Sequence, residues 1–242
     1  MCTVTWHHSE EGYDVLCNRD ELKTRKPALP PQIKEIHGVR YLAPIDGDAG
    51  GAWIGVNEFG ICLGLLNHYA ATRIAAHQSS ISRGRLLISL MDVASQTETL
   101  HRLQQHCLDS YLPFILLAFA SGKPVSSFTW DGRDRHYDEL EAARMPVTTS
   151  SFASQQVVAH RHRGFQLLDL KQDDMTVDRL LAFHRSHIPA ANAYAVCMHR
   201  DDANTVSLSH VKIKPADIEF RYYPNSPCQH EVESRTRLAR RV

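Results

Sequence analysis

The amino-acid sequence predicts an α+β fold in which mainly antiparallel sheets pack against helices. Short β-type runs joined by tight turns dominate both ends of the chain, and segments of helical period lie between them. The order is strands, helices, strands, helices, strands, and no linker rich in Gly, Ser or Pro divides it. Hairpins favour antiparallel sheets over βαβ units, so we expect a single domain over residues 1–242 with helices outside the sheets.

The expected elements follow from hydrophobic period and turn signals. Strands are expected, in chain order, at residues 2–6, 13–17, 52–57, 61–66, 114–120, 125–130, 193–198, 205–211 and 218–223. Helices are expected from Ser82 to Met91, after a cap at Thr97, and over residues 156–170 and 176–187. The segment 23–32 holds three prolines and is expected to be an extended loop.

Composition excludes several classes of protein. The 242 residues carry 27 Lys+Arg and 27 Asp+Glu, and this zero formal charge argues against a nucleic-acid partner. The longest apolar run, 114–120, is about a third of the roughly 20 residues that a membrane helix needs. A hydrophobic share of 43% is ordinary for globular proteins. The basic end, at about 230–242, is expected to be a solvated tail.

The six cysteines are spread thinly and form no CxxC pair. This usage favours free thiols in a reducing compartment over a disulfide framework. With no pattern of a secretory signal at the start, we expect a cytoplasmic protein that does not insert into membranes. The oligomeric state is left open.

Cys2 is the first candidate for chemistry. Removal of Met1 would leave a cysteine whose free α-amine titrates at about pH 7.7 and can accept the thiol proton. One residue would then supply both nucleophile and base. The alternative is that Cys2 is an ordinary second residue.

Three polar residues end the second expected strand, namely Asn18, Arg19 and Asp20. In an antiparallel hairpin this end lies beside the start of the first strand, so these side chains are expected to surround the Cys2 thiol. A guanidinium favours the thiolate, and a carboxylate can bind the α-ammonium group. The alternative is a surface ion pair at a strand end.

A glycine pair precedes the third expected strand. Gly50 and Gly51 allow a positive φ and close backbone approach, which suits a pocket wall or an amide-lined oxyanion site. Trp53 is expected in the core or at the pocket rim, and Asn67, at the end of the next strand, offers an amide donor. The alternative is a tight turn into a strand.

Together these residues resemble the NRDE family, also called the transport and Golgi organisation protein 2 family. The resemblance rests on Met1-Cys2 with Trp6, on Asn18-Arg-Asp-Glu21, Ala49-Gly-Gly-Ala-Trp-Ile-Gly-Val-Asn57, Leu66-Asn67 and Ser82-Arg-Gly84. Its bacterial branch is suggested by Thr148-Thr-Ser-Ser-Phe152, Phe183-His-Arg-Ser-His187 and Val196-Cys-Met-His-Arg-Asp-Asp-Ala203 with Thr205-Val-Ser207.

That family is similar to N-terminal-nucleophile hydrolases of the bile-salt hydrolase and penicillin acylase type. The resemblance implies a four-layer αββα sandwich with Cys2 as nucleophile. It implies that Asp20 holds the α-amine, that Arg19 supports the thiolate and that Asn67 donates to the oxyanion.

Two departures from the family pattern matter. Where the hydrolases carry a later oxyanion Asn, this chain has Ser150-Ser151, and Ser151 is taken as the candidate. The family's GGTW pattern is Gly-Gly-Ala-Trp here, so a hydroxyl is lost at Ala52. Arg200 follows the strand expected at 193–198 and is a further substrate-binding candidate; the alternative for it is a charged turn.

The histidine-rich segments predict no metal site. His160-Arg-His162 and His184-Arg-Ser-His187 fall on expected helices, where solvated faces are the default. Zinc needs four ligands, and no Cys or His partner stands at a familiar spacing. In a strand at 193–198, Cys197 and Met198 would point to opposite sides.

Two functions therefore remain open. The first is a cysteine amidohydrolase without cofactor that cleaves a non-peptide C–N amide of a small molecule through a thioester. The second is binding and trafficking of haem or another apolar cofactor inside the cell, without catalysis. Substrate choice is expected to depend on the loop 68–81.

Overall fold

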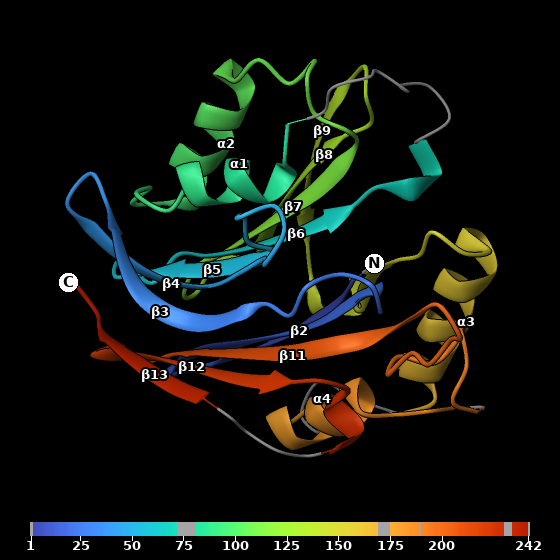
Figure 1. Ribbon diagram of the computed structural model, residues 1–242. Coiled ribbons are helices and arrows are strands. Elements are labelled where there is room, and N and C mark those ends of the chain that lie inside the picture. Colours follow the sequence, from blue (N-terminus) through green and yellow to red (C-terminus); the bar gives the residue numbers. More distant parts are fainter. Residues whose placement is uncertain (1, 72–80, 169–174, 189, 230–233, 242) are drawn as a thin grey trace.

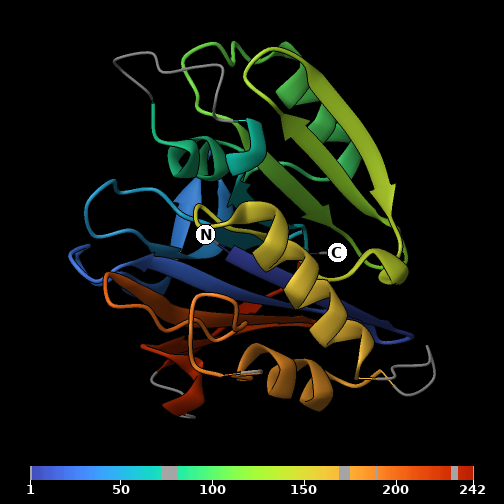
Figure 2. The same cartoon turned by 90° about the vertical axis from the view of Figure 1, so that its right-hand side faces the viewer.

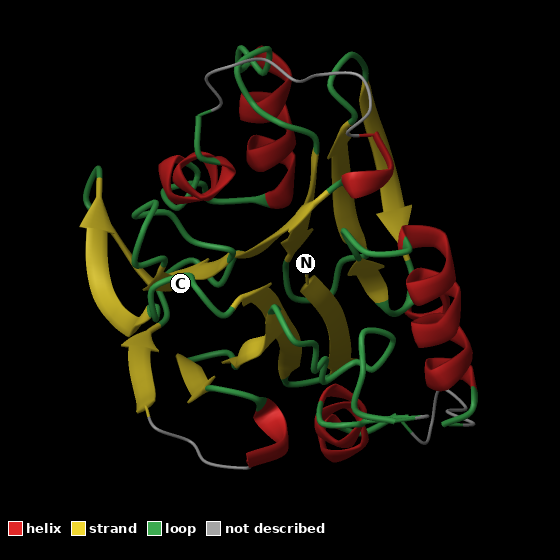
Figure 3. Ribbon diagram, turned by 45° about the vertical axis from the view of Figure 1, so that its right-hand side comes forward, coloured by secondary structure: helices red, strands yellow, loops and turns green. Residues whose placement is uncertain are grey.

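The computed structural model describes residues 2–71, 81–168, 175–188, 190–229 and 234–241, and these form four layers in the order αββα (Figure 1). Two antiparallel sheets stack face to face, and a pair of helices covers the outer face of each. Figure 3 shows this arrangement, with strands in the middle and helices at the outside. The α+β fold class predicted from the sequence is confirmed.

Six strands form the first sheet, in the order β10-β1-β2-β11-β12-β13. Their bounds are β1 Cys2–Ser9, β2 Gly12–Leu22, β10 Val147–Thr149, β11 Ala203–Ile213, β12 Asp217–Pro224 and β13 Ser234–Ala239. The second sheet has seven strands, in the order β3-β4-β5-β6-β7-β8-β9. Their bounds are β3 Leu29–Ile36, β4 Val39–Ile45, β5 Ile54–Asn57, β6 Cys62–Asn67, β7 Phe114–Phe119, β8 Val125–Trp130 and β9 Arg135–Leu140.

The helices lie on the outer faces of the two sheets (Figures 1 and 2). The seven-stranded sheet is covered by α1 (Arg83–Ser89) and α2 (Gln96–Gln105), and the six-stranded sheet by α3 (Ser154–Gln166) and α4 (Val177–His184). The second helix is capped by Ser95, which accepts from the backbone N–H of Glu98, and not by Thr97 as expected. Short 3-10 turns add η1 (Tyr69–Ala71), η2 (Ala142–Arg144) and η4 (Pro227–Gln229).

Alternation along β1 divides its side chains between two environments. Cys2, Val4 and Trp6 enter the core between the sheets, where Trp6 packs edge-on against Phe119 of β7. Thr3 and Thr5 face the helix layer. Because the period of a strand is two, one strand supplies both the inter-sheet core and the polar contacts with α3 and α4.

Three further sequence-based expectations about elements are wrong. The proline-containing segment continues into β3, an edge strand in which the missing N–H groups of Pro30 and Pro31 are tolerated. Residues 193–198 form an irregular segment and not a strand. The supposed basic tail contains β13, which pairs with β12.

The described part of the tail is held by charge and by burial. Arg237 of β13 lies 2.9 Å from the carboxylate of Glu219 in β12, and Leu238 is buried. Thr236 donates a hydrogen bond to the carbonyl of Pro31, which joins the edges of the two sheets. No helix among the described residues is long and apolar enough to cross a membrane.

Candidate active site

The hairpin of β1 and β2 places Cys2 directly opposite Arg19 and Thr3 opposite Asn18. The expected proximity of these two strand ends is therefore confirmed. Cys2 is 6% exposed and lies in the wall of a cavity of about 340 Å³ between the two sheets' ends. Six of the residues expected from the sequence line this cavity: Cys2, Arg19, Asp20, Gly51, Trp53 and Asn67.

The thiol of Cys2 is the acidic member of a buried cysteine pair. A hydrogen bond from Cys17 lowers the pKa of Cys2 against the opposing effects of burial and of the Asp20 charge, and the positive charge of Arg19 adds the smallest lowering. The same hydrogen bond and burial raise the pKa of Cys17 well above its ordinary value. Cys2 is thus the thiol of the pair that ionises first, and thiolate character is what a nucleophile needs.

Arg19 is oriented by its neighbours on the cavity wall. Its guanidinium forms an ion pair with Asp46 and lies over the ring of Trp53, with 4.3 Å between Cζ and the ring centroid. Arg25 also binds Asp46, with Nη2 2.9 Å from Oδ1. Burial opposes ionisation of Asp46, but hydrogen bonds from Arg25 and the Ala49 N–H hold its pKa at about 2. Much of the charge of Arg19 is therefore balanced by Asp46.

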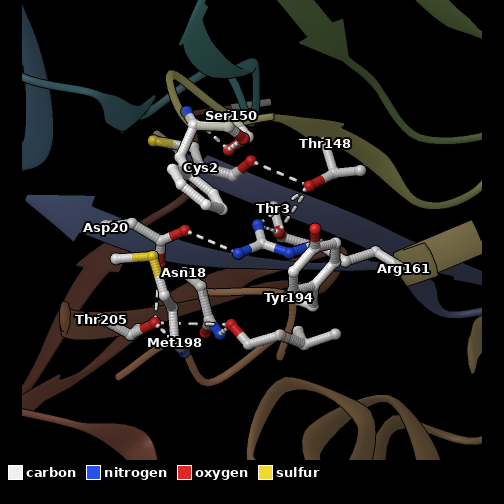
Figure 4. A network of polar contacts seen from close by, with 12 residues as sticks. Cys2, Thr3, Asn18, Asp20, Thr148, Ser150, Arg161, Tyr194, Met198 and Thr205 are labelled. Atoms are coloured by element: carbon white, nitrogen blue, oxygen red, sulfur yellow. Dashed lines mark hydrogen bonds and ion pairs between the residues drawn. The ribbon is translucent and has the colours of Figure 1, made fainter. Parts of the chain in front are cut away.

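Asp20 is held from the side of the helix layer. Its carboxylate accepts from Arg161 Nη2 at 3.2 Å and from Thr205 Oγ1 at 2.6 Å. Figure 4 shows Arg161 reaching Asp20 from α3 beneath the start of β1. The side chains of both members of this ion pair are 0% exposed.

Arg161 also connects the start of β1 to β10. Its Nη1 donates to Thr3 Oγ1 at 2.8 Å and to Thr148 Oγ1 at 3.1 Å, and Thr148 Oγ1 donates to the carbonyl of Cys2 at 3.3 Å (Figure 4). The network therefore holds the Cys2 backbone and the Asp20 carboxylate through one cation. Such a network restricts the position of the nucleophile.

Sequence reasoning missed Arg161 because it stands between His160 and His162 in a segment assigned to a solvated face. A signal was present: Arg161 lies four residues after Val157 and four before Phe165, and all three are buried on α3. The i, i+4 spacing placed Arg161 on the apolar face.

The glycine pair acts mainly through backbone packing. Gly50 has a φ of +65°, as its turn requires, but its N–H donates to the carbonyl of Asp46 at 3.0 Å. The expected use of the Gly50 amide as an oxyanion donor is therefore wrong. A Cβ on Gly51 would stand 2.6 Å from the carbonyl carbon of Gly84, so this contact admits glycine alone.

Asn67 and Arg83 reach the cavity from the other sheet and from α1. Asn67 Nδ2 donates to the hydroxyl of Tyr69 at 2.8 Å, which leaves its second N–H for another acceptor. Arg83 lines the cavity and donates to the carbonyl of Pro113. Burial lowers the pKa of Arg83, while the nearby Tyr69 and Cys2 raise it. Arg83 was not expected as a site residue, although it stands inside the Ser82-Arg-Gly84 motif.

Besides Gly50, three expected substrate-binding residues lie outside the cavity. Asn18 is fully buried and donates to the carbonyls of His184 and Val196, so it anchors the helix layer. Ser151 is exposed, whereas its neighbour Ser150 is buried beside Cys2 (Figure 4). Arg200 pairs with Asp202 and lies over the ring of Phe152. Of the loop 68–81, residues 72–80 lie outside the described part of the chain.

A second, larger cavity of about 760 Å³ lies at the other end of β1. Apolar side chains such as Trp6, Met145 and Phe165 line much of it, and His8 and His162 lie in its wall. Burial lowers the pKa of both histidines, which favours their neutral, metal-ligating form.

Comparison with known proteins agrees with this fold. The family model described as Transport and Golgi organisation 2 matches residues 1–225. No curated protein sequence matches the chain. An N-acylethanolamine-hydrolyzing acid amidase ortholog from Caenorhabditis elegans superposes with a TM-score of 0.61 at 10% identity, covering 87% of this chain and 92% of that one.

A second solved structure is similar over nearly its whole length. A variant of the conjugated bile acid hydrolase from Clostridium perfringens superposes with a TM-score of 0.52 at 11% identity, covering 100% of this chain and 97% of that one. At these identities the likeness shows the fold, which is that of N-terminal-nucleophile hydrolases.

Proposed function

The chain belongs to the Transport and Golgi organisation 2 family and has an N-terminal-nucleophile hydrolase fold, and from this premise we propose that it is a cysteine amidohydrolase. The observation that carries the proposal is the position of Cys2. Its buried thiol has a lowered pKa and lies in the wall of a cavity that Arg19, Asp20 and Asn67 also line.

The reaction divides amide hydrolysis into two transfers. After removal of Met1, the α-amine of Cys2 takes the thiol proton, and Sγ forms a bond to the carbonyl carbon of the substrate. The C–N bond breaks, the leaving amine takes that proton, and a thioester remains on Cys2. Water then attacks the thioester, which releases a carboxylic acid and restores the thiol.

The surrounding residues take distinct parts in this proposal. Asn67 Nδ2 donates to the oxyanion that develops on the carbonyl oxygen. Cys2 of β1 is paired with Arg19 of β2, so the next residue of β2, Asp20, lies just beyond the start of β1. The α-ammonium group of Cys2 would lie there once Met1 is removed. Arg83 and Trp53 present a cation and an aromatic face on the cavity wall, which suits a small acylated substrate with an anionic group. The six free thiols support a reducing compartment such as the cytoplasm as the place of this activity.

The second candidate function, binding of haem or another apolar ligand, is favoured by the cavity of about 760 Å³. Its apolar wall suits a flat hydrophobic ligand, and the neutral imidazoles of His8 and His162 are the chemistry that binds haem iron. This cavity lies apart from Cys2, so the two candidate functions make different predictions for Cys2 variants.

Intact mass and turnover test the enzymatic proposal. Protein produced with normal methionine aminopeptidase should lack Met1, and N-acyl amino acids, N-acyl lactones, penicillin V or bile-salt conjugates should be turned over. Cys2→Ala should abolish turnover and the transient mass gain of one acyl group, and iodoacetamide should no longer label the cavity thiol. Cys107→Ala, which removes an exposed thiol, is the matched control.

Two results would contradict the proposal. Retention of Met1 in the mature protein removes the α-amine on which the mechanism depends. Absence of turnover together with saturable haem binding that is unchanged in Cys2→Ala would support the second candidate.

A further inference from the structure

Two histidines and two cysteines far apart in the sequence meet on the outer side of the six-stranded sheet. His187 follows α4, Cys197 and His199 belong to the irregular segment before β11, and Cys228 lies in η4. One ligand atom from each of the four residues lies within 4.8 Å of all the others. Among the described residues none of the four lines the Cys2 cavity.

The distances match those between the ligands of a tetrahedral metal ion. The Nε2 atoms of His187 and His199 are 3.1 Å apart, and His199 Nε2 lies 3.6 Å from Cys197 Sγ and 3.7 Å from Cys228 Sγ. Zinc bonds of about 2.3 Å to sulfur and about 2.0–2.1 Å to nitrogen give, at tetrahedral angles, about 3.3 Å between nitrogens and about 3.6 Å between nitrogen and sulfur.

The sequence-based argument against a metal concerned neighbouring residues of an expected strand, whereas the cluster draws its ligands from three separate segments. The backbone of the irregular segment before β11 is fixed by single hydrogen bonds to different partners, from Cys197 N to Ser186 O and from His199 N to Asn192 O. Cys197 and His199 are two residues apart, a spacing that sends side chains to one side even in a strand, and both turn toward the same point. His187 is half-buried there, and not on a solvated helix face.

We propose that His187, Cys197, His199 and Cys228 bind one zinc ion. Two thiolates and two imidazoles are a soft to borderline donor set that suits zinc. Four protein ligands fill the tetrahedron and leave no position for substrate, so the site is structural. It ties the end of α4, the segment before β11 and the turn after β12 to one another.

The zinc site adjoins the supports of the candidate active site. Met198, between the two ligands Cys197 and His199, donates its backbone N–H to Thr205 Oγ1, and that hydroxyl donates to Asp20. The metal would therefore fix the backbone of Met198, whose N–H holds the Thr205 hydroxyl in place. The site does not depend on the amidohydrolase proposal, because none of its ligands takes part in that reaction.

Metal analysis of the purified full-length chain tests the proposal. Protein expressed with added zinc should contain close to one zinc per chain. After removal of zinc with a chelator under reducing conditions, Co²⁺ should restore the visible bands of a tetrahedral ion and the near-ultraviolet absorption of its thiolate ligands. Removal of zinc should also lower the Tm.

Single substitutions identify the ligands. Cys228→Ser and His199→Asn should each weaken zinc binding by more than about 100-fold. Loss of a group that only hydrogen-bonds to a metal ligand costs up to about 100-fold, and loss of a ligand itself should cost more. Cys107→Ser and His101→Asn, at exposed positions of the same residue types, should retain the wild-type zinc content.

Each contrary result has a definite meaning. A disulfide between Cys197 and Cys228 in protein purified without reductant but with zinc present would overturn the site. So would wild-type protein that lacks zinc and gives no tetrahedral Co²⁺ spectrum, a result that does not depend on whether any variant folds. A different metal bound by the same four side chains would overturn the assignment to zinc.

Discussion

Arg161 and Asp20 form an ion pair whose two side chains have no exposure to solvent. Removing charges from water is costly, and the pair tolerates burial because both charged groups form further hydrogen bonds. Thr3 and Thr148 accept from the guanidinium, and Thr205 donates to the carboxylate. The pair sets the start of β1, from which Cys2 enters the cavity.

Replacing Arg161 with Met should therefore destabilise the protein strongly. Removal of one partner of a buried ion pair leaves an uncompensated charge and costs about 3–5 kcal/mol of unfolding free energy. Urea unfolding measures this loss, and Arg163→Met, an exposed position on the same helix, is the control with equal helix propensity. The double variant Asp20→Asn with Arg161→Met should recover part of the loss. Equal stability of the two Arg variants would contradict the role of the pair.

At the residue scale, the sequence predicted the residues that line the candidate site better than the residues that hold them in place. Cys2, Arg19 and Asp20 could be grouped because hairpin geometry alone brings two strand ends together. The i, i+4 spacing could have placed Arg161 on the buried face of α3. The partners of Arg161 and Arg83 depend on how α3 and α1 pack on the sheets, which local spacing does not contain. Asn18 was misplaced since its direction depends on the alternation of β2, which sends it toward the helix layer.

Helix α4 is attached to the six-stranded sheet through its last residue, His184. Its Nε2 lies 2.8 Å from Thr5 Oγ1 of β1, and its carbonyl accepts from Asn18 of β2. Burial lowers the pKa of His184 to about 3, with smaller lowering by the charges of His210 and Arg161. The imidazole is therefore neutral in the folded protein at physiological pH.

This helix attachment should make stability depend on pH. The pKa of His184 is 6.5 in the unfolded chain and about 3 in the folded protein. The stabilisation by the neutral ring is therefore complete above pH 6.5 and is lost as the pH falls toward 3. The slope is at most about 1.4 kcal/mol per pH unit. His184→Gln keeps a hydrogen-bonding group toward Thr5 but does not titrate.

Urea unfolding at pH 7, 6 and 5 measures the slope of unfolding free energy. The unfolding free energy of His184→Gln is subtracted from that of the wild type at each pH. The difference should decline with falling pH, and it removes the contribution of carboxylates that titrate in both proteins. His101→Gln, on the exposed side of α2, controls for the substitution itself. Parallel curves for wild type and His184→Gln would show that this ring does not couple helix attachment to pH.

At the element scale, prediction succeeded where the chain carries a strong local pattern. The strand at 125–130 was placed with its observed bounds, because apolar residues precede the Asp131-Gly132 turn. Strand β3 was missed because prolines normally exclude strands, and only its place at the sheet edge admits them. Strand β13 was missed because its arginines pair with Glu219, a partner visible only once β12 is beside it.

On the scale of the whole molecule, the two sheets are joined by one apolar core and by a buried tyrosine hydroxyl. Tyr13 of β2 lies 2.8 Å from the carbonyl of Gly60 and 3.1 Å from that of Phe119, and it accepts from the N–H of Cys62 at 3.2 Å. Burial raises the pKa of Tyr13 well above its ordinary value, so the hydroxyl keeps its proton as a donor. A single group thus connects β2 of one sheet to the turn before β6 and to the end of β7 in the other.

Tyr13→Phe should weaken the joining of the sheets without disturbing the packing of the ring. The substitution removes one oxygen and leaves buried carbonyl and N–H groups without their partner, which costs about 1–3 kcal/mol. For a chain of this size each kcal/mol lowers the Tm by about 2–4 °C, so calorimetry should find the transition shifted down but still a single one. Tyr137→Phe on β9, where the side chain is 41% exposed, should shift the Tm far less. Equal shifts for the two variants would mean that the hydroxyl of Tyr13 does not hold the sheets together, and that the apolar core alone joins them.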